Sequence, residues 1–165
     1  MKIAMITGAS SGFGREFVRQ IDSLYKELDE IWVVARRVER LHELQSRTMT
    51  KLRVFGGDLL EEEIYQEISE ALSDENPNIR MLVNAAGFGK TGTVEEIDEK
   101  TQLEMIDTNC RSLTRMTKIC LPFDKRKPRS QYRFGGSVLP TAVVCRIRGN
   151  KILCVEFQQG ATGRT

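Results

Sequence analysis

The sequence is poor in the residues on which several classes of site depend. It has a single histidine, His42, and four cysteines, none of which forms a C-x-x-C pair. A lone histidine has no second imidazole with which to hold a metal or build a triad, and isolated thiols of an intracellular chain stay reduced. We therefore expect neither a metal site nor a structural disulfide.

Long apolar runs are also missing. No stretch approaches the roughly 18 consecutive apolar residues of a membrane span, and the opening "MKIAMITG" is a short apolar run that ends in glycine. Neither a membrane helix nor a signal peptide is predicted. We expect a cytoplasmic protein with no membrane attachment and, at 165 residues, a single domain.

The charge is unevenly distributed along the chain. Residues 1–122 hold 16 Lys or Arg against 21 Asp or Glu, a net −5, whereas residues 123–165 hold 9 against 2, a net +7. A basic tail can bind nucleic acid or another acidic partner, but it can also be a segment of different origin. The aromatic residues show no basic-aromatic pattern typical of a single-strand platform. We therefore do not predict a nucleic-acid partner.

The first 122 residues alternate between two periods. Short apolar or β-branched runs have the size and composition of buried parallel strands, and the stretches between them have helical spacing, with Leu41, Leu44 and Met49 on one face of the second. Strands are expected at 2–7, 31–35, 52–55 and 79–84, and helices at 12–28, 37–49, 61–75 and 98–121. This alternation predicts a doubly wound α/β fold, a parallel sheet with helices on both faces.

A glycine-rich motif, TGASSGFG, runs from Thr7 to Gly14 at the junction of the first predicted strand and helix. Gly8, Gly12 and Gly14 permit a tight turn and let the backbone approach a pyrophosphate, which would meet the N–H groups and the positive dipole end of the helix. An ordinary glycine-rich turn is the alternative. The strand-to-helix context is the one that a dinucleotide-binding motif requires.

The spacing T-G-x-x-x-G-x-G resembles the short-chain dehydrogenase/reductase family. Further motifs occur in the order and spacing of that family: ARR (35–37) ends the second strand, GDL (57–59) follows the third, NAAG (84–87) ends the fourth, and Asn109 lies in the next helix. The resemblance implies an incomplete Rossmann-type sheet with the strand order 3-2-1-4. We interpret residues 1–122 as a partial NAD(P)-binding domain and residues 123–165 as a basic tail with poorly defined structure.

The resemblance also implies a cofactor site. The matching positions are Gly8, Ser10, Ser11, Gly12, Phe13, Gly14, Arg36, Arg37, Asp58, Leu59, Asn84, Ala85 and Gly87. In the family, the residue at Asp58 hydrogen-bonds the adenine, and the residue at Leu59 flanks it. The segment from Asn84 to Gly87 would line the nicotinamide side.

The end of the second strand indicates which dinucleotide binds. NAD-preferring sites usually place an acidic residue there, whereas an arginine can pair with the 2′-phosphate of NADP. Arg36 and Arg37 stand at this position. We predict NADP(H) in preference to NAD(H); the alternative is that both arginines are solvated residues at the start of a helix.

Most catalytic residues of the family have no match. The family transfers hydride between NADP(H) and a small carbonyl or alcohol substrate, using a tyrosine, a lysine four residues later, a serine and an asparagine. The lysine is needed because an unperturbed phenol, with a pKa of about 10, is a poor acid or base at neutral pH. Asn109 matches the asparagine, but every tyrosine has another residue at the lysine spacing: Tyr25 has Asp29, Tyr65 has Ser69 and Tyr132 has Gly136. We predict an inactive member; a non-catalytic dinucleotide-binding or regulatory module is the alternative.

The missing motif can be recovered from the tail in another reading frame. Residues 131–162 can be translated back into their allowed codons and read again one base further on. The shifted frame permits a Y-x-x-x-K motif, with its tyrosine at the position of Ile147 and its lysine at the position of Lys151. It also permits a serine at the position of Phe134. We hypothesise that a frameshift between about residues 123 and 130 replaced the catalytic half. The fourth strand would then be an exposed edge. The run around RGNK (148–151) has enough β-branched residues to form a strand that covers this edge. We do not predict such a strand.

Overall fold

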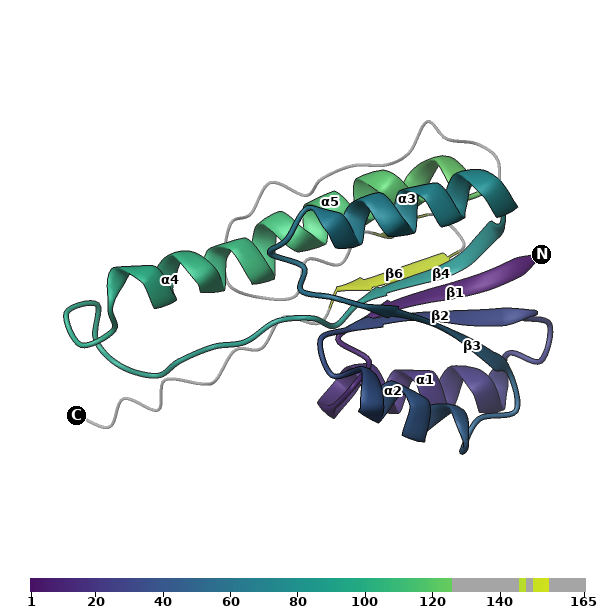
Figure 1. The fold of residues 1–165 in the computed structure, drawn as a ribbon, viewed down its shortest axis with the longest axis horizontal. Helices are drawn as coiled ribbons and strands as arrows, with labels where there is room; N and C mark the ends of the chain where they lie inside the picture. The colour runs from purple at the N-terminus through teal and green to yellow at the C-terminus, as the bar shows by residue number, and fades with distance from the viewer. Residues whose placement is uncertain (126–145, 148–149, 155–165) are drawn as a thin grey trace.

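A parallel sheet forms the centre of the molecule. The structure, a computed structural model, describes residues 1–125, 146–147 and 150–154 (Figure 1). Strands β1 (Lys2–Thr7), β2 (Glu30–Ala35), β3 (Lys51–Gly56) and β4 (Asn78–Asn84) are parallel and lie in the order β3-β2-β1-β4. The predicted fold class and strand order are confirmed, and each of these strands ends within one residue of its predicted bounds.

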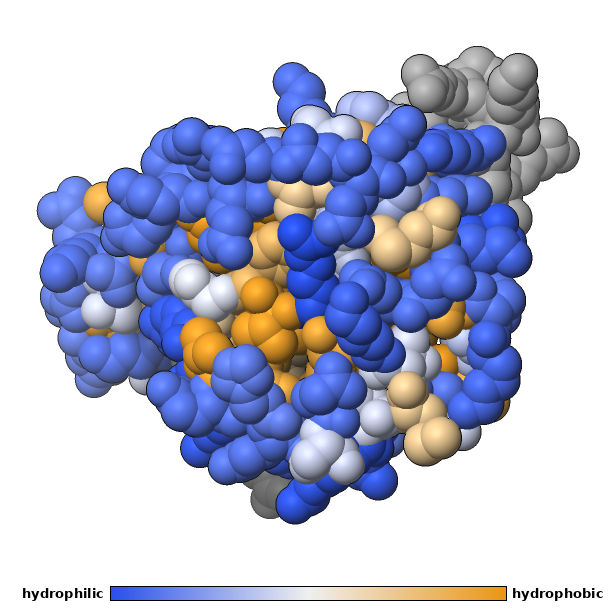
Figure 2. Space-filling view, turned by 45° about the vertical axis from the view of Figure 1, so that its right-hand side comes forward, coloured by the Kyte–Doolittle hydropathy of each residue, from blue (hydrophilic) through white to orange (hydrophobic). Residues whose placement is uncertain are grey.

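Helices cover both faces of this sheet. Helices α1 (Gly12–Leu24) and α2 (Val38–Gln45) lie on one face, and α3 (Glu63–Glu75) and α5 (Ser112–Cys120) lie on the other (Figure 1). Side chains alternate between the faces along a strand, so Met5 packs in the cluster under α3 and α5 while Ile6 packs under α1. Apolar helix faces are thereby turned inward, and the surface in Figure 2 is largely hydrophilic around an apolar hollow.

The second helix ends earlier than we predicted. It stops at Gln45, and Met49, which we placed on its apolar face, is 89% exposed. The buried carboxylate of Asp22 on α1 accepts hydrogen bonds from the backbone N–H groups of Met49 (3.1 Å) and Thr50 (2.8 Å). Because these N–H groups point to Asp22, they do not donate within a helix, and the chain runs extended into β3.

Asp22 should make stability depend on pH. Burial raises the pKa of Asp22, but the N–H donors of Thr50 and Met49 and the charge of Lys26 outweigh it, so this pKa lies below its ordinary value. A carboxyl group whose pKa is lower in the folded state stabilises the fold above its unfolded pKa, and that contribution is lost as pH falls through the folded pKa. We expect Asp22→Asn to lower the free energy of unfolding by about 1–2 kcal/mol at neutral pH.

Thermal unfolding of both chains from neutral pH down to about pH 3 measures this effect, and the difference should shrink below about pH 4. Glu67→Gln is the control, because Glu67 is an exposed carboxylate on α3. A stability difference for Asp22→Asn that stays constant over the whole range would contradict the assignment.

The long helix predicted over 98–121 is interrupted. It consists of α4 (Glu99–Ile106), a π-helical turn η1 (Asp107–Arg111), α5, and a short 3-10 turn η2 (Leu121–Phe123). No sequence signal marks the wider turn. Single π turns within α-helices are frequent at functional sites, and this one contains Asn109.

The tail supplies a strand that we did not predict. Strand β6 (Asn150–Cys154) pairs in parallel with β4, with Leu153 opposite Val83, and β5 (Arg146–Ile147) pairs antiparallel with β6. The full order is β3-β2-β1-β4-β6-β5. The expectation that β4 stays an edge is therefore wrong, because its open row of N–H and C=O groups is a template for any extended segment. Phe134 and most of residues 123–165 lie outside the described residues.

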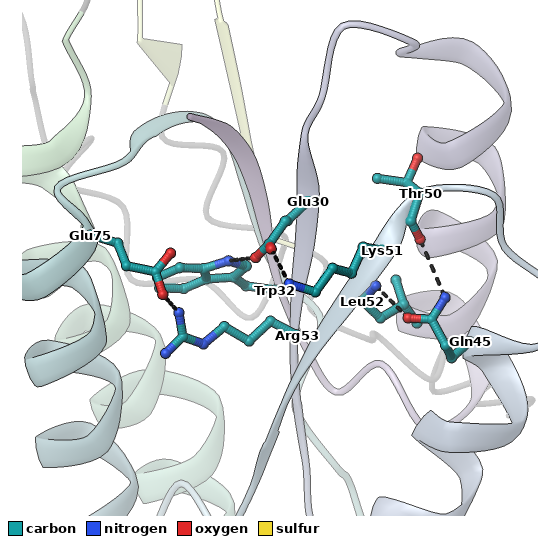
Figure 3. A network of polar contacts seen from close by, with 8 residues as sticks. All are labelled: Glu30, Trp32, Gln45, Thr50, Lys51, Leu52, Arg53 and Glu75. Atoms are coloured by element: carbon teal, nitrogen blue, oxygen red, sulfur yellow. Dashed lines mark hydrogen bonds and ion pairs between the residues drawn. The ribbon is translucent and has the colours of Figure 1, made fainter.

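A polar network joins β2 and β3 near their amino ends (Figure 3). The buried carboxylate of Glu30 accepts from the indole N–H of Trp32 (3.0 Å) and from the ammonium group of Lys51 (2.6 Å). The guanidinium of Arg53 lies 4.6 Å from the Trp32 ring centroid and pairs with Glu75 of α3. A buried carboxylate is tolerated when it is paired and hydrogen-bonded. We assign this network to stability.

Candidate functional site

The carboxyl ends of β1 to β4 bring the predicted site residues to one edge of the sheet. The glycine motif follows β1, Arg36 and Arg37 follow β2, Asp58 follows β3, and residues 85–87 follow β4. The strand order reverses direction at β1, which lies between β2 and β4. Doubly wound folds bind ligands at such a switch point, beyond the carboxyl ends of the strands. This edge is the candidate functional site.

The glycines of the motif allow two close backbone contacts and two left-handed residues. Gly8 has a φ of +69°, and a Cβ there would lie 2.6 Å from the carbonyl oxygen of Ala85. A Cβ on Gly14 would lie 2.3 Å from the carbonyl oxygen of Gly8, so α1 packs directly on the loop. Gly12 has a φ of +53°, but a Cβ there would meet nothing within 4 Å. The space beside Gly12 is open at the point where the motif would receive a pyrophosphate.

The start of α1 is suited to an anion. Ser11 is the N-cap residue but makes no side-chain capping bond, and the first turn, which includes the half-exposed Phe13, carries no acidic residue. Arg37 instead donates to the hydroxyl groups of Ser11 (2.7 Å) and Ser10 (3.4 Å). The positive end of the helix dipole and the guanidinium therefore act in the same place. Phosphate groups are favoured there.

Arg36 and Asp58 meet across the loops after β2 and β3. Their Nη1 and Oδ2 atoms are 3.4 Å apart, and the Arg36 side chain is 74% exposed. An exposed ion pair adds little stability, so Arg36 is able to turn toward a ligand phosphate at little cost. Leu59, next along the chain, is buried in the core cluster under α3.

Beyond β4, side chains from β1 and η1 hold the backbone. The hydroxyl of Thr7 accepts from the N–H of Ala86 (3.2 Å). The Asn109 amide binds both backbone groups of Phe88: Oδ1 accepts from its N–H (3.0 Å) and Nδ2 donates to its carbonyl (2.9 Å). A Cβ on Gly87 would lie 2.8 Å from Asn109 Oδ1, so the glycine admits this amide. Asn109 fixes the loop on the predicted nicotinamide side.

The family model described as short chain dehydrogenase matches residues 2–133. The chain belongs to the short chain dehydrogenase family. The match includes every motif at the carboxyl edge and continues past residue 122, where we place the domain boundary. The family is one of oxidoreductases that use a nicotinamide dinucleotide.

Individual relatives agree with the assignment. The chain is 32% identical to sulfoacetaldehyde reductase 2 of Chromohalobacter salexigens, over 73% of this chain and 48% of that protein. It is 25% identical to 17-beta-hydroxysteroid dehydrogenase type 3 of Danio rerio, over 96% of this chain and 54% of that protein. The structure of L-sorbose reductase from Gluconobacter frateurii with NADPH and L-sorbose superposes with a TM-score of 0.64 at 27% identity, over 74% of this chain and 47% of that one. The chain thus spans about half the length of the curated relatives it matches.

Three residues that support this edge of the short chain dehydrogenase sheet were missed in the sequence: Tyr65, Arg115 and Thr117. Thr117 on α5 accepts through its hydroxyl from Nδ2 of Asn84 (3.2 Å), a predicted residue of the nicotinamide side that is buried in the structure. Tyr65 and Arg115 support the loop after β3 from α3 and α5. These contacts join one element to another, and no local spacing rule reveals them. In the sequence, Tyr65 was considered only as a catalytic candidate, because it has Ser69 at the lysine spacing.

The described residues hold neither a membrane-spanning helix nor a cluster of metal ligands. In the part of the chain that the structure describes, no helix combines the length and apolar character needed to cross a bilayer. The same residues contain no group of three or more His, Cys, Asp or Glu side chains placed to hold a metal ion.

Proposed function

We propose that this chain binds NADP(H) at the carboxyl edge of its sheet. The observation that carries the proposal is the placement of Arg37 against Ser11 at the start of α1, with Arg36 beside it at the end of β2. A 2′-phosphate at this position would receive charge-assisted hydrogen bonds, which NAD cannot use. The L-sorbose reductase solved with NADPH, a relative of similar fold, supports this choice.

The backbone at the edge fits a dinucleotide. Gly8 and Gly14 bring the loop, α1 and the end of β4 into direct contact, and Gly12 leaves open space at the start of the helix. A bound nicotinamide would supply the hydride chemistry of the family. The residues of this chain would hold its phosphates through Arg36, Arg37 and the start of α1, and Asn109 would keep the loop at Phe88 in place.

We also propose that this chain does not transfer hydride. No tyrosine is followed four residues later by lysine. Tyr65 is buried and donates to the Leu59 carbonyl, and burial raises the pKa of its phenol. Tyr25 caps the carboxyl end of α1, away from the carboxyl edge of the sheet, and Tyr132 lies outside the described residues. A non-catalytic dinucleotide-binding role follows.

The origin of the tail is a separate proposal. The change of charge at residue 123 and the recoverable Y-x-x-x-K support a frameshift between about residues 123 and 130. The alternative is a tail in the original frame, and the alignment with the Danio rerio relative, which extends over 96% of this chain, favours it. Reading the gene decides: a shifted frame without tyrosine and lysine codons at Ile147 and Lys151 contradicts the frameshift.

Titration of NADPH and NADH into the purified chain tests the binding proposal. Trp32 is fully buried on β2 and lies three residues before the end of that strand, about 10 Å from the edge, so its fluorescence reports binding without being part of the site. We expect NADPH to bind more tightly than NADH, and no reduction of a panel of ketones and aldehydes. Turnover would contradict the proposed inactivity, and absence of binding would contradict the proposed site.

A further inference from the structure

We propose that Tyr65 is a positioning residue for the adenosine half of the cofactor, an inference that rests on the proposed function. Its hydroxyl donates to the carbonyl oxygen of Leu59 at 2.7 Å. Leu59 follows Asp58 directly in the loop at the end of β3. Tyr65 lies on α3 behind this loop and does not stand among the predicted cofactor contacts. Its role would be to set where the loop backbone lies.

The loop itself is a tight turn built on Asp58. The Asp58 carboxylate accepts from the N–H of Leu60 (3.1 Å), and its carbonyl accepts from the N–H of Glu61 (3.0 Å). These bonds define an Asx-type turn, but they do not fix how the turn is oriented relative to the sheet. The hydrogen bond from the Tyr65 hydroxyl to the carbonyl of Leu59, a residue only 9% exposed, fixes that orientation. Without that donor a buried carbonyl loses its partner, which is costly.

Tyr65 is itself held from two sides. The residue is 3% exposed, and the guanidinium of Arg115 on α5 lies 3.9 Å from its ring centroid. Arg115 also pairs with Glu62, the N-cap residue of α3. A cation over a ring and an ion pair at the helix start fix the ring between α3 and α5. Since burial raises the pKa of the phenol, the hydroxyl keeps its proton and remains a donor.

The supported turn connects to the phosphate site. The second oxygen of the Asp58 carboxylate accepts from Arg36 at 3.4 Å, so the turn lies beside the guanidinium that would meet the 2′-phosphate. A preorganised turn lowers the ordering cost of binding. On the nicotinamide side, Asn109 holds Phe88 in a comparable way. The helical segment from η1 to α5 therefore supports both halves of the edge, through Asn109 in η1 and Arg115 in α5.

The substitution Tyr65→Phe tests the inference, because it removes the hydroxyl and keeps the ring under Arg115. The probe is 2′,5′-ADP, which carries the adenine, the ribose and the 2′-phosphate, measured by calorimetric titration. We expect its affinity to fall about three- to tenfold, the range of one hydrogen bond. In the free protein, amide hydrogen exchange at Leu60 and Glu61 should become faster. Arg115→Met, which keeps the hydroxyl and releases the ring, should lower the affinity less.

Asp22→Asn is the matched control. It also weakens hydrogen bonds from a buried side chain to a loop next to β3, but that loop lies at the amino end of the strand, away from the candidate site. It should leave the affinity for 2′,5′-ADP unchanged. An equal loss of affinity in Tyr65→Phe and Asp22→Asn would assign the effect to general stability and overturn the inference. Unchanged affinity and unchanged exchange in Tyr65→Phe would overturn it while the proposed function stands. No binding by the unsubstituted chain would overturn both.

Discussion

Replacing Gly8 by alanine is expected to lower the free energy of unfolding by several kcal/mol and to remove NADPH binding. The left-handed backbone, with a φ of +69°, costs an L-residue about 1–2 kcal/mol. The new Cβ would lie 2.6 Å from the Ala85 carbonyl oxygen, and overlap of this kind costs about 1–3 kcal/mol. Relief requires the loop after β1 to move away from the end of β4, which opens the switch point. Urea unfolding and NADPH titration measure the two effects.

Two other glycines separate the causes. Gly12 has a φ of +53°, but a Cβ there would have open space. We therefore expect Gly12→Ala to lower the free energy of unfolding only by the cost of the left-handed backbone, about 1–2 kcal/mol. Gly89→Ala has open space and no left-handed backbone, and its stability should stay within about 0.5 kcal/mol of the original. Equal losses for Gly8→Ala and Gly12→Ala would show that contact with Ala85 contributes nothing.

Replacing Arg37 by alanine is expected to weaken NADPH binding about ten- to a hundredfold, the range of hydrogen bonds to a charged group. NADH, which has no 2′-phosphate, should change less than about threefold. Arg37→Lys keeps the charge but loses the planar fork of donors, so an intermediate loss is expected. Dissociation constants for both dinucleotides, measured on all variants, provide the comparison.

Arg19→Ala is the matched control for charge, because Arg19 is an exposed residue on α1 that pairs with Glu16 of the same helix. It should leave the ratio of the two dissociation constants unchanged. An equal loss of NADPH and NADH affinity in Arg37→Ala would mean that Arg37 holds the glycine loop through Ser11 and does not select the cofactor.

Strands β1 to β4 were predictable because their pattern depends mainly on burial. β2 is buried at every position, and a strand covered on both faces reads as an uninterrupted apolar run. Helix ends were less predictable because distant residues set them. The bonds from Met49 and Thr50 to Asp22 hold the chain that follows the second helix, and a carboxylate more than twenty positions away in the sequence leaves no local signal.

The same division holds at the candidate site. Motif residues such as Gly8 and Arg36 follow strand ends, so placing the strands placed them too. Tyr65 and Arg115 were missed because their partners come from other elements. β6 was missed for a different reason: strand pairing uses backbone groups that every non-proline residue carries, so side-chain patterns discriminate poorly between segments that pair and segments that do not.

The pairing of β6 has a consequence for how such a domain closes. Its partners on β4 are Leu82 to Asn84, the last three residues of that strand. The backbone is thus secured on both sides immediately before it enters the loop at Ala85 that contacts Gly8. A short strand that joins the sheet at the carboxyl end of β4 holds the strand ends that surround the candidate site. A strand of equal length at the amino end of β4 would leave those strand ends free to move apart.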